Sequence, residues 1–366
     1  MIASMNDLSV QSPRKRYSGF DALRLIAALG VLWSHSYAMR GVPLSEPIFK
    51  ATGGMLNGGM LSVSTFFAIS GYLVTQSFAA RADGTHGWLW FLRARALRIM
   101  PGLLACILVT VVACAFVTTL DAASYWGSPI TWRYLWSNAA LIHYNSLPGT
   151  FSSNVAGDGV NGSIWTLRLE VGMYAATLAF GVLGIWKSRP LTLVVSLLLI
   201  LWCALMPTTF IFYLHSVSWV LFSVLCYVVG AAIYVLRLSQ RALYAALIAV
   251  LVAFCGATLA EFDIIVPRVL ASIALTLGAI WIGRMDSVVL RSTTHWGDLS
   301  YGVFLYSAPI QQLLVWANPS PSSAFVLLGS AVISLLMAMA SWRFVERPML
   351  NLKQAHTPTQ PQAVAG

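Results

Sequence analysis

Apolar residues arrive in runs of about 20 along most of this chain, separated by short polar segments. A run of that length lets a helix cross the hydrocarbon of a bilayer, which is about 30 Å thick. Pro207 and the polar residues between 213 and 218 interrupt the pattern between the fifth and sixth runs, so nine or eleven spans are alternatives to the number predicted next. The pattern predicts ten spans, near residues 20–40, 58–80, 100–120, 163–185, 190–213, 215–236, 242–260, 265–284, 298–318 and 323–343.

Composition supports a membrane protein. The 366 residues are 58% hydrophobic and 9% charged, whereas a soluble domain has about 25% charged residues. We therefore expect an all-α, polytopic integral membrane bundle over residues 19–350, between a cytoplasmic tail at 1–18 and a disordered cytoplasmic tail at 351–366. The first run contains Asp21, Arg24 and His35 and lacks a small-residue cleavage site, so it is expected to stay as a helix.

The positive charges predict the orientation. With the N-terminus inside, 16 of the 22 Lys and Arg residues fall in cytoplasmic segments or at their borders. Arg40, Lys50, Arg133 and Arg268 fall outside. This positive-inside bias predicts an even number of crossings and two cytoplasmic termini. The formal charge of +10 does not indicate nucleic-acid binding, because no basic run interleaved with aromatic residues is present.

The five cysteines lie inside apolar runs and have no metal-ligand spacing, so we expect small buried side chains, no disulfide and no metal. The longest polar connection, residues 121–162, contains "LPGTFSSNVAGDGVNGS" and faces outward on this topology. Such a loop either covers a site for an extracytoplasmic acceptor or serves as a flexible connector.

Arg24 and His35 are the first candidates for chemistry. They are eleven residues apart on the first predicted helix, which places them on one face and about 16 Å apart along the axis. This spacing suits a long ligand whose anionic head pairs with the guanidinium and whose reactive end reaches the imidazole. The alternatives are a local pair of Arg24 with Asp21 and a packing role for His35.

Glu170 is the next candidate, at a depth in the fourth run similar to that of His35 in the first. A carboxylate bonded to one imidazole nitrogen would fix the tautomer and leave the other nitrogen to take a proton from a hydroxyl. Alternatively, Glu170 pairs with Arg168 or with a neighbouring helix and holds the bundle together.

Two further segments carry candidate binding residues. Arg93, Arg95 and Arg98 precede the third predicted span and form a cluster for nucleotide phosphates, although basic residues at inner helix ends are also what membrane insertion favours. Ser70 and Gly71 lie in the middle of the second span, where small residues also permit close helix packing.

Six segments, taken in order over nearly the whole chain, resemble the acyltransferase 3 family of bacterial membrane O-acyltransferases, which modify cell-surface glycans. They are "DALRLIAALGVLWSH", "STFFAISGYLV", "FLRARALRIMPGL", "NGSIWTLRLEVGMY", "GDLSYGVFLYSAPIQQ" and "SWRFVERPM". The resemblance implies an O-acetyltransferase of the bacterial inner membrane that takes an acyl group, most often acetyl, from acyl-CoA. The implied partners are a glycan or lipid-linked sugar as acceptor and membrane lipid.

The resemblance also implies residue roles. His35 would be the catalytic base or a transient acyl carrier, supported by Glu170. Acyl-CoA would be bound by Arg24, Arg93, Arg95 and Arg98. The candidates for substrate binding are Ser70, Asn161, Trp165 and Tyr301.

This chain departs from the family at one motif. Many members have a His where Ser307 stands in "SYGVFLYSAP", which leaves His35 as the candidate base. The "YGVFLYSAPIQQLL" variant looks most like the members that modify exopolysaccharide. No SGNH-type domain follows the predicted bundle, so we expect transfer to the acceptor without a fused partner or through a separate protein. The alternative function is a glycan or small-solute transporter or flippase, since intramembrane Arg, His and Glu also serve proton relays.

Overall fold

The computed structural model describes residues 17–80, 87–205, 211–212, 215–286 and 297–352. Within these residues, ten long helices coincide with the ten apolar runs. They are α1 (Ser18–Met39), α3 (Gly58–Ala79), α4 (Gly87–Cys114), α7 (Trp165–Val182), α8 (Arg189–Leu205), α9 (Val217–Leu236), α10 (Gln240–Leu259), α11 (Ile265–Gly283), α13 (Ser300–Ala317) and α14 (Ser323–Ser341). The helical class is confirmed. Most of residues 1–18 and of 351–366, the predicted tails, lie outside the described residues.

Short elements connect the long helices. They are η2 (Pro43–Ser45), α2 (Pro47–Ala51), α5 (Ala122–Gly127), α6 (Pro129–Ala139), η3 (Ile185–Lys187), the π-helical η4 (Trp342–Glu346) and α15 (Arg347–Asn351). Two-residue strands β1 (Ile211–Phe212) and β2 (His215–Ser216) pair antiparallel between α8 and α9. The fifth and sixth runs are therefore two separate helices, whereas Pro207 itself lies outside the described residues.

The helices expose apolar side chains, as a protein surrounded by lipid does. In the described part of the chain, α3, α4, α10, α11 and the helix Ser323–Asn351 are long and apolar enough to cross a membrane, and α8 and most of α9 form shorter apolar helices. Leu198 on α8 and Val252 on α10 are more than half exposed. Exposed apolar surface on this scale requires a non-aqueous surrounding. The chain is an integral membrane protein.

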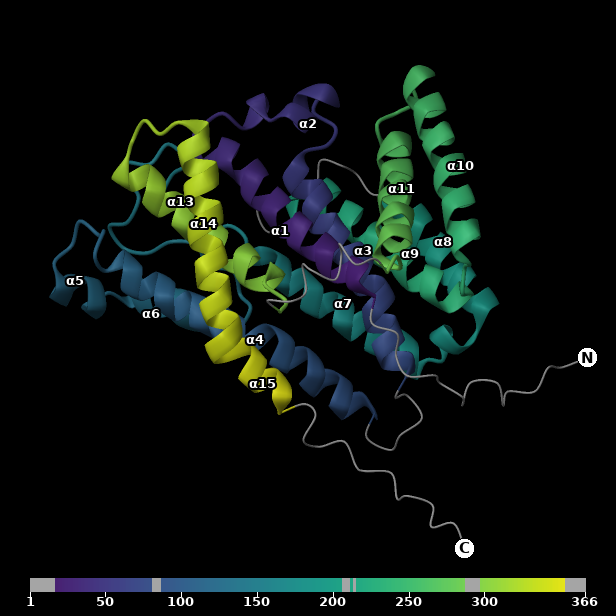
Figure 1. Ribbon diagram of the computed structural model, residues 1–366, viewed down its shortest axis with the longest axis horizontal. Coiled ribbons are helices and arrows are strands. Elements are labelled where there is room, and N and C mark those ends of the chain that lie inside the picture. The colour runs from purple at the N-terminus through teal and green to yellow at the C-terminus, as the bar shows by residue number, and fades with distance from the viewer. Residues whose placement is uncertain (1–16, 81–86, 206–210, 213–214, 287–296, 353–366) are drawn as a thin grey trace, which may run out of the picture.

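Helix α1 runs through the middle of the bundle. It packs against α3, α13 and α11, with the α13–α14 pair on one side and the α9–α11 group on the other (Figure 1). Helices α3 and α9 approach closely because two glycines face the opposing backbone. A Cβ on Gly71 would lie 2.0 Å from the carbonyl oxygen of Tyr227, and one on Gly230 would lie 2.3 Å from that of Ala68. Gly71 therefore has the packing role that small residues take in membrane helices.

Helix α4 begins earlier than its apolar run predicts. It starts at Gly87 instead of near residue 100, so Arg93, Arg95 and Arg98 lie on the helix itself. The arginines lower the local hydropathy, but Arg is a good helix former and the backbone continues without interruption. One rigid helix therefore carries all three basic side chains, and Arg95 and Arg98 point into the bundle.

The segment 121–162 is an ordered structure packed on the bundle, and not a flexible connector. The side-chain amide of Asn154 donates to the Gln312 side-chain oxygen at 2.7 Å, and the Gln312 amide donates to the carbonyl of Gly159 at 2.6 Å. Tyr125 and Tyr134, which belong to this segment, are fully buried. None of these residues lines the two cavities described below, so the segment reaches the site only by orienting α7, which follows it.

Candidate active site

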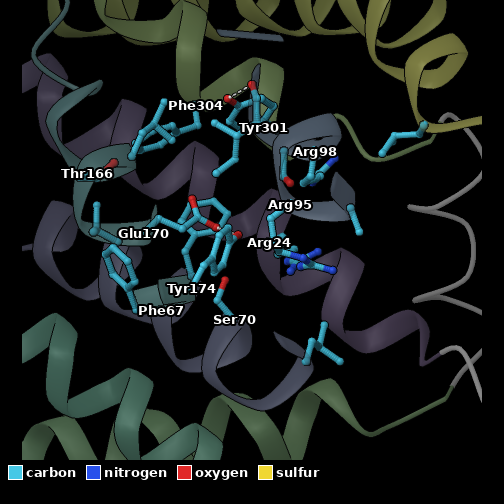
Figure 2. Close-up of a pocket in the computed structure, with 18 residues that line it drawn as sticks. Arg24, Phe67, Ser70, Arg95, Arg98, Thr166, Glu170, Tyr174, Tyr301 and Phe304 are labelled. Atoms are coloured by element: carbon cyan, nitrogen blue, oxygen red, sulfur yellow. Dashed lines mark hydrogen bonds between the residues drawn. The ribbon is translucent and has the colours of Figure 1, made fainter. Parts of the chain in front are cut away.

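A cavity of about 250 Å³ lies where α1, α3, α4, α7 and α13 meet (Figure 2). We call it the inner cavity. Its polar lining includes Arg24, Ser70, Arg95, Arg98, Glu170 and Tyr301. These six residues are all candidates from the sequence, and five helices bring them together in one cavity.

The inner cavity has a charged side and an aromatic side. The side chains of Arg24, Arg95 and Arg98 lie on one side of the view in Figure 2, and Phe67 and Phe304 lie on the other. Arginine is suited to phosphate because its planar guanidinium donates paired hydrogen bonds. The cavity therefore fits a ligand with phosphates at one end and an apolar arm at the other.

Asp298, just before α13, holds two of these arginines. Its carboxylate lies 2.5 Å from Arg98 and 3.8 Å from Arg24, and it accepts a 2.5 Å hydrogen bond from the Ser300 hydroxyl. Burial opposes ionisation of Asp298, but the two guanidinium charges and the Ser300 hydrogen bonds outweigh it, so the pKa is lowered. The carboxylate stays charged and orients both arginines toward the cavity.

Arg98 has a second acidic neighbour, and Arg95 has aromatic ones. Glu346 in the π-helical turn lies 3.9 Å from Arg98 and accepts a 2.8 Å hydrogen bond from Ser341. The Arg95 guanidinium lies 5.6 Å from the ring centroid of Tyr174, a distance that allows a cation–π contact. Its Nε is buried without a hydrogen-bond partner among the described residues, so Arg95 keeps a donor for a ligand.

A second cavity, of about 360 Å³, contains His35. We call it the outer cavity. It is also lined by Ser34, Glu46, Phe49, Asn57 and Trp165. The Nδ1 atom of His35 is buried and has no hydrogen-bond partner within the described chain. An unpaired buried polar atom is costly, so this nitrogen marks a place for a ligand group or a proton.

The carboxylate of Glu46 is fixed in the wall of the outer cavity. It accepts a 2.5 Å hydrogen bond from the backbone N–H of Phe49 and a 3.0 Å bond from that of Gly58. Together they anchor the short helix α2 to the start of α3. The outer cavity thus combines a carboxylate, an amide, hydroxyls and aromatic rings, which are side chains suited to a polyhydroxylated ligand with apolar faces.

The two cavities meet at Val63 of α3. Among the described lining residues, Val63 is common to both. On α7 the consecutive residues Trp165 and Thr166 line the outer and the inner cavity respectively. Arg24 and His35, eleven residues apart, therefore face two cavities in series about 16 Å apart along α1.

Glu170 lies in the inner cavity and not beside His35. It accepts a short hydrogen bond from the Tyr174 hydroxyl, one turn further along α7. Because α7 begins with Trp165 at the level of His35, Glu170 lies about 7.5 Å further along that helix. The number of residues from each helix end does not reveal this displacement, because it does not show how high α7 lies relative to α1. The structure therefore places Glu170 with the arginines instead of on the imidazole.

Two other sequence candidates, Arg93 and Asn161, lie apart from the cavities, and so does Ser307. Arg93 is exposed, and its guanidinium donates to the Leu352 carbonyl at 3.4 Å. Asn161 is buried where it donates to the Leu305 carbonyl at 2.9 Å, so it fixes the start of α7. Ser307, which replaces the second family histidine, is buried and donates to the Phe304 carbonyl at 3.2 Å.

Asp298, Glu346 and Glu46 are site residues that the sequence reasoning did not single out. A signal was available, because the chain has only 12 acidic residues and the first two lie in the segments "GDLSYG" and "FVERPM". An acidic residue at the end of a membrane helix requires a partner. In the described chain, no three His, Cys, Asp or Glu side chains gather to hold a metal ion.

Comparison with known proteins identifies the class. Residues 17–343 match the acyltransferase 3 family, described as an acyltransferase domain, and the chain belongs to that family. It is 29% identical to a protein named O-acetyl transferase from Shigella phage Sf6, over 91% of this chain and 96% of the relative. It is 24% identical to nodulation protein 10 of Rhizobium leguminosarum bv. viciae, over 92% and 94% of the two chains. No solved structure gives a significant match. The prediction of an acyltransferase enzyme, of the O-acetyltransferase type, is confirmed.

Proposed function

We propose that this protein transfers an acetyl group from acetyl-CoA, on the cytoplasmic side, to a hydroxyl of a cell-surface or lipid-linked carbohydrate on the other side. The observation that carries this proposal is the series of two cavities, with three arginines in the first and His35 in the second. The name of the phage relative favours acetyl as the acyl group and oxygen as the acceptor atom.

The proposal includes a topology. All ten long helices cross the bacterial inner membrane, and both termini are cytoplasmic. Arg24 lies near the start of α1, and Arg95 and Arg98 lie in the first half of α4, so this orientation puts the inner cavity toward the cytoplasm. The end of α1, with His35, then lies toward the outside. Donor and acceptor approach from opposite faces.

The inner cavity fits the donor by its chemistry. Acyl-CoA carries phosphates at one end and a thioester at the tip of a long, narrow arm. Arg24, Arg95 and Arg98 pair with the phosphates, and the arm extends past Phe67 and Phe304 toward the outer cavity. Asp298 holds the guanidinium groups of Arg24 and Arg98 in place before the donor binds.

His35 acts as the general base. Its free nitrogen takes the proton from the acceptor hydroxyl as the oxygen attacks the thioester carbonyl. The new C–O bond forms, the C–S bond breaks, and the departing thiolate takes the proton back from the imidazole. Acetylated acceptor and CoA thiol are the products, and His35 is regenerated. Glu170 contributes from the inner cavity, where its bond to Tyr174 sets the ring beneath Arg95.

The direct test follows radiolabelled acetyl from acetyl-CoA into the glycan fraction of native membranes. His35→Ala is expected to abolish labelling at equal membrane protein. His143→Ala is the matched control, because His143 contacts the Asn161 carbonyl at 3.4 Å outside both cavities. Equal labelling by wild type and His35→Ala sinks the proposal.

A transporter or flippase is the alternative that intramembrane Arg, His and Glu also suggest. Membership of an acyltransferase family disfavours it. Binding of CoA by the purified protein, together with solute flux that is independent of a proton gradient, distinguishes the enzyme from the transporter.

A further inference from the structure

The two cavities adjoin at Val63 of α3, with Trp165 and Thr166 of α7 at the same level. Val63 faces both cavities, and Phe66, Phe67 and Phe304 line the inner cavity around it. The three arginines of the inner cavity lie on the side away from Phe67 and Phe304 (Figure 2). A group that passes from the arginines to His35 must therefore pass apolar side chains at Val63.

The position of this junction at Val63 is fixed by the packing of α3. Gly71 and Gly230 bring the backbones of α3 and α9 into contact, so α3 has no room to move away from the cavities. Phe66 packs edge-to-face on Phe304, with ring centroids 5.8 Å apart. Packed interiors adjust little to added volume, and an apolar pocket discriminates against one extra methylene by roughly 10-fold or more.

The reaction makes this junction selective for the acyl group. The phosphates remain with the arginines, whereas the thioester carbonyl must reach His35. The acyl chain attached to that carbonyl must fit beside Val63 while the acceptor occupies the outer cavity. An acetyl group adds one methyl there, and a butyryl group adds two more carbons. Val63→Ala removes two carbons from the same place.

Resting on the proposed function, we propose that Val63 determines the length of the acyl group, and that the donor class of this enzyme is short-chain acyl-CoA with acetyl preferred. The isopropyl group leaves space for acetyl and excludes longer chains. Replacing it by a smaller side chain admits them. A larger side chain restricts even acetyl.

The experiment offers acetyl-CoA, propionyl-CoA and butyryl-CoA separately to native membranes that contain the full chain. Ester-linked acyl groups are released from the glycan fraction with mild alkali and identified by mass spectrometry. Wild type is expected to prefer acetyl. Val63→Ala is expected to raise the butyryl-to-acetyl ratio by about 10-fold or more, the effect of roughly one to two methylenes in an apolar pocket. A gain of transfer to longer chains is not produced by misfolding.

Val74→Ala is the matched control, since Val74 lies on the same helix, is 1% exposed and is absent from both cavity linings. It is expected to keep the wild-type ratio. Val63→Ile, which adds one carbon, is expected to lower transfer of propionyl and butyryl relative to acetyl, and it serves where Val63→Ala fails to reach the membrane. An unchanged ratio in active Val63→Ala or Val63→Ile overturns the inference. Wild type without product from any donor overturns the proposed function and this inference with it.

Discussion

Arg98 and Asp298 form an ion pair at 2.5 Å that joins the middle of α4 to the start of α13. The pair also determines where Arg24 points, because the same carboxylate oxygen lies 3.8 Å from that guanidinium. The inner cavity is thus built around one buried acid shared by two arginines from helices far apart in the sequence. This relationship leads to the first two predictions.

Asp298→Asn is expected to destabilise the protein. Removing one partner of a buried ion pair leaves an uncompensated charge, which costs on the order of 3 kcal/mol. Glu346 compensates only part of this loss, since it lies 3.9 Å from Arg98. The measurement is thermal unfolding in detergent. Asp121→Asn is the control, because that carboxylate is exposed and caps α5, and asparagine caps a helix about as well as aspartate does. Equal effects of the two substitutions contradict this prediction.

The contribution of Asp298 to stability is expected to depend on pH with a definite sign. Its pKa is lowered in the folded protein, so it stabilises the fold above the unfolded value of about 3.9 and loses this contribution as pH falls through the folded pKa. The difference in Tm between wild type and Asp298→Asn should therefore be constant from roughly pH 5 to pH 8, where the Asp298 carboxylate is charged in both the folded and the unfolded wild type. It should shrink below about pH 4. A difference that disappears near neutral pH argues against a charged Asp298.

Arg95 and Arg93 are expected to differ in their effect on donor binding, although they are two residues apart. Arg95 lines the inner cavity and Arg93 is exposed. Loss of a charge-assisted hydrogen bond costs about 1.5–3 kcal/mol, so Arg95→Ala should weaken CoA binding by about 10-fold to 100-fold. Arg93→Ala should leave binding unchanged. Isothermal titration of the solubilised protein with CoA measures the affinity of both variants. Equal losses of affinity would falsify the assignment of Arg95 to the cavity face of α4 and of Arg93 to its exposed face.

Glu170→Gln is expected to raise the KM for acetyl-CoA and to leave the pH dependence of kcat unchanged. The reason is that Glu170 bonds Tyr174 in the inner cavity, whereas His35 lies in the outer one. Tyr174→Phe, which removes the same hydrogen bond, should reproduce the KM effect. A shifted pH profile in Glu170→Gln would instead indicate that the carboxylate acts on the imidazole.

The sequence pattern predicts the helices well and the site only in part. Apolar runs locate all ten long helices because length and hydropathy are local properties. The start of α4 is displaced because charged residues interrupt hydropathy without interrupting a helix. Arg24 and His35 share one face because both lie on one regular helix, eleven residues apart.

Contacts between helices account for what the sequence did not predict. The choice of Arg95 over Arg93 depends on the rotation of α4 in the bundle, and the distance between His35 and Glu170 depends on the relative heights of α1 and α7. Asp298 meets Arg98 from 200 residues away. Spacing within one segment contains no information about these relationships, which arise from tertiary packing.

We expect donor binding and proton transfer to take place in two separate cavities. The decisive variant is His35→Gln, for which CoA affinity and acetyl transfer are measured on the same solubilised preparation. We expect an unchanged Kd for CoA, because the arginines of the inner cavity remain. Transfer should fall by about 10²-fold to 10⁴-fold, the usual contribution of a general base. Transfer at the wild-type rate, or a loss of CoA binding equal to the loss of transfer, would contradict this expectation.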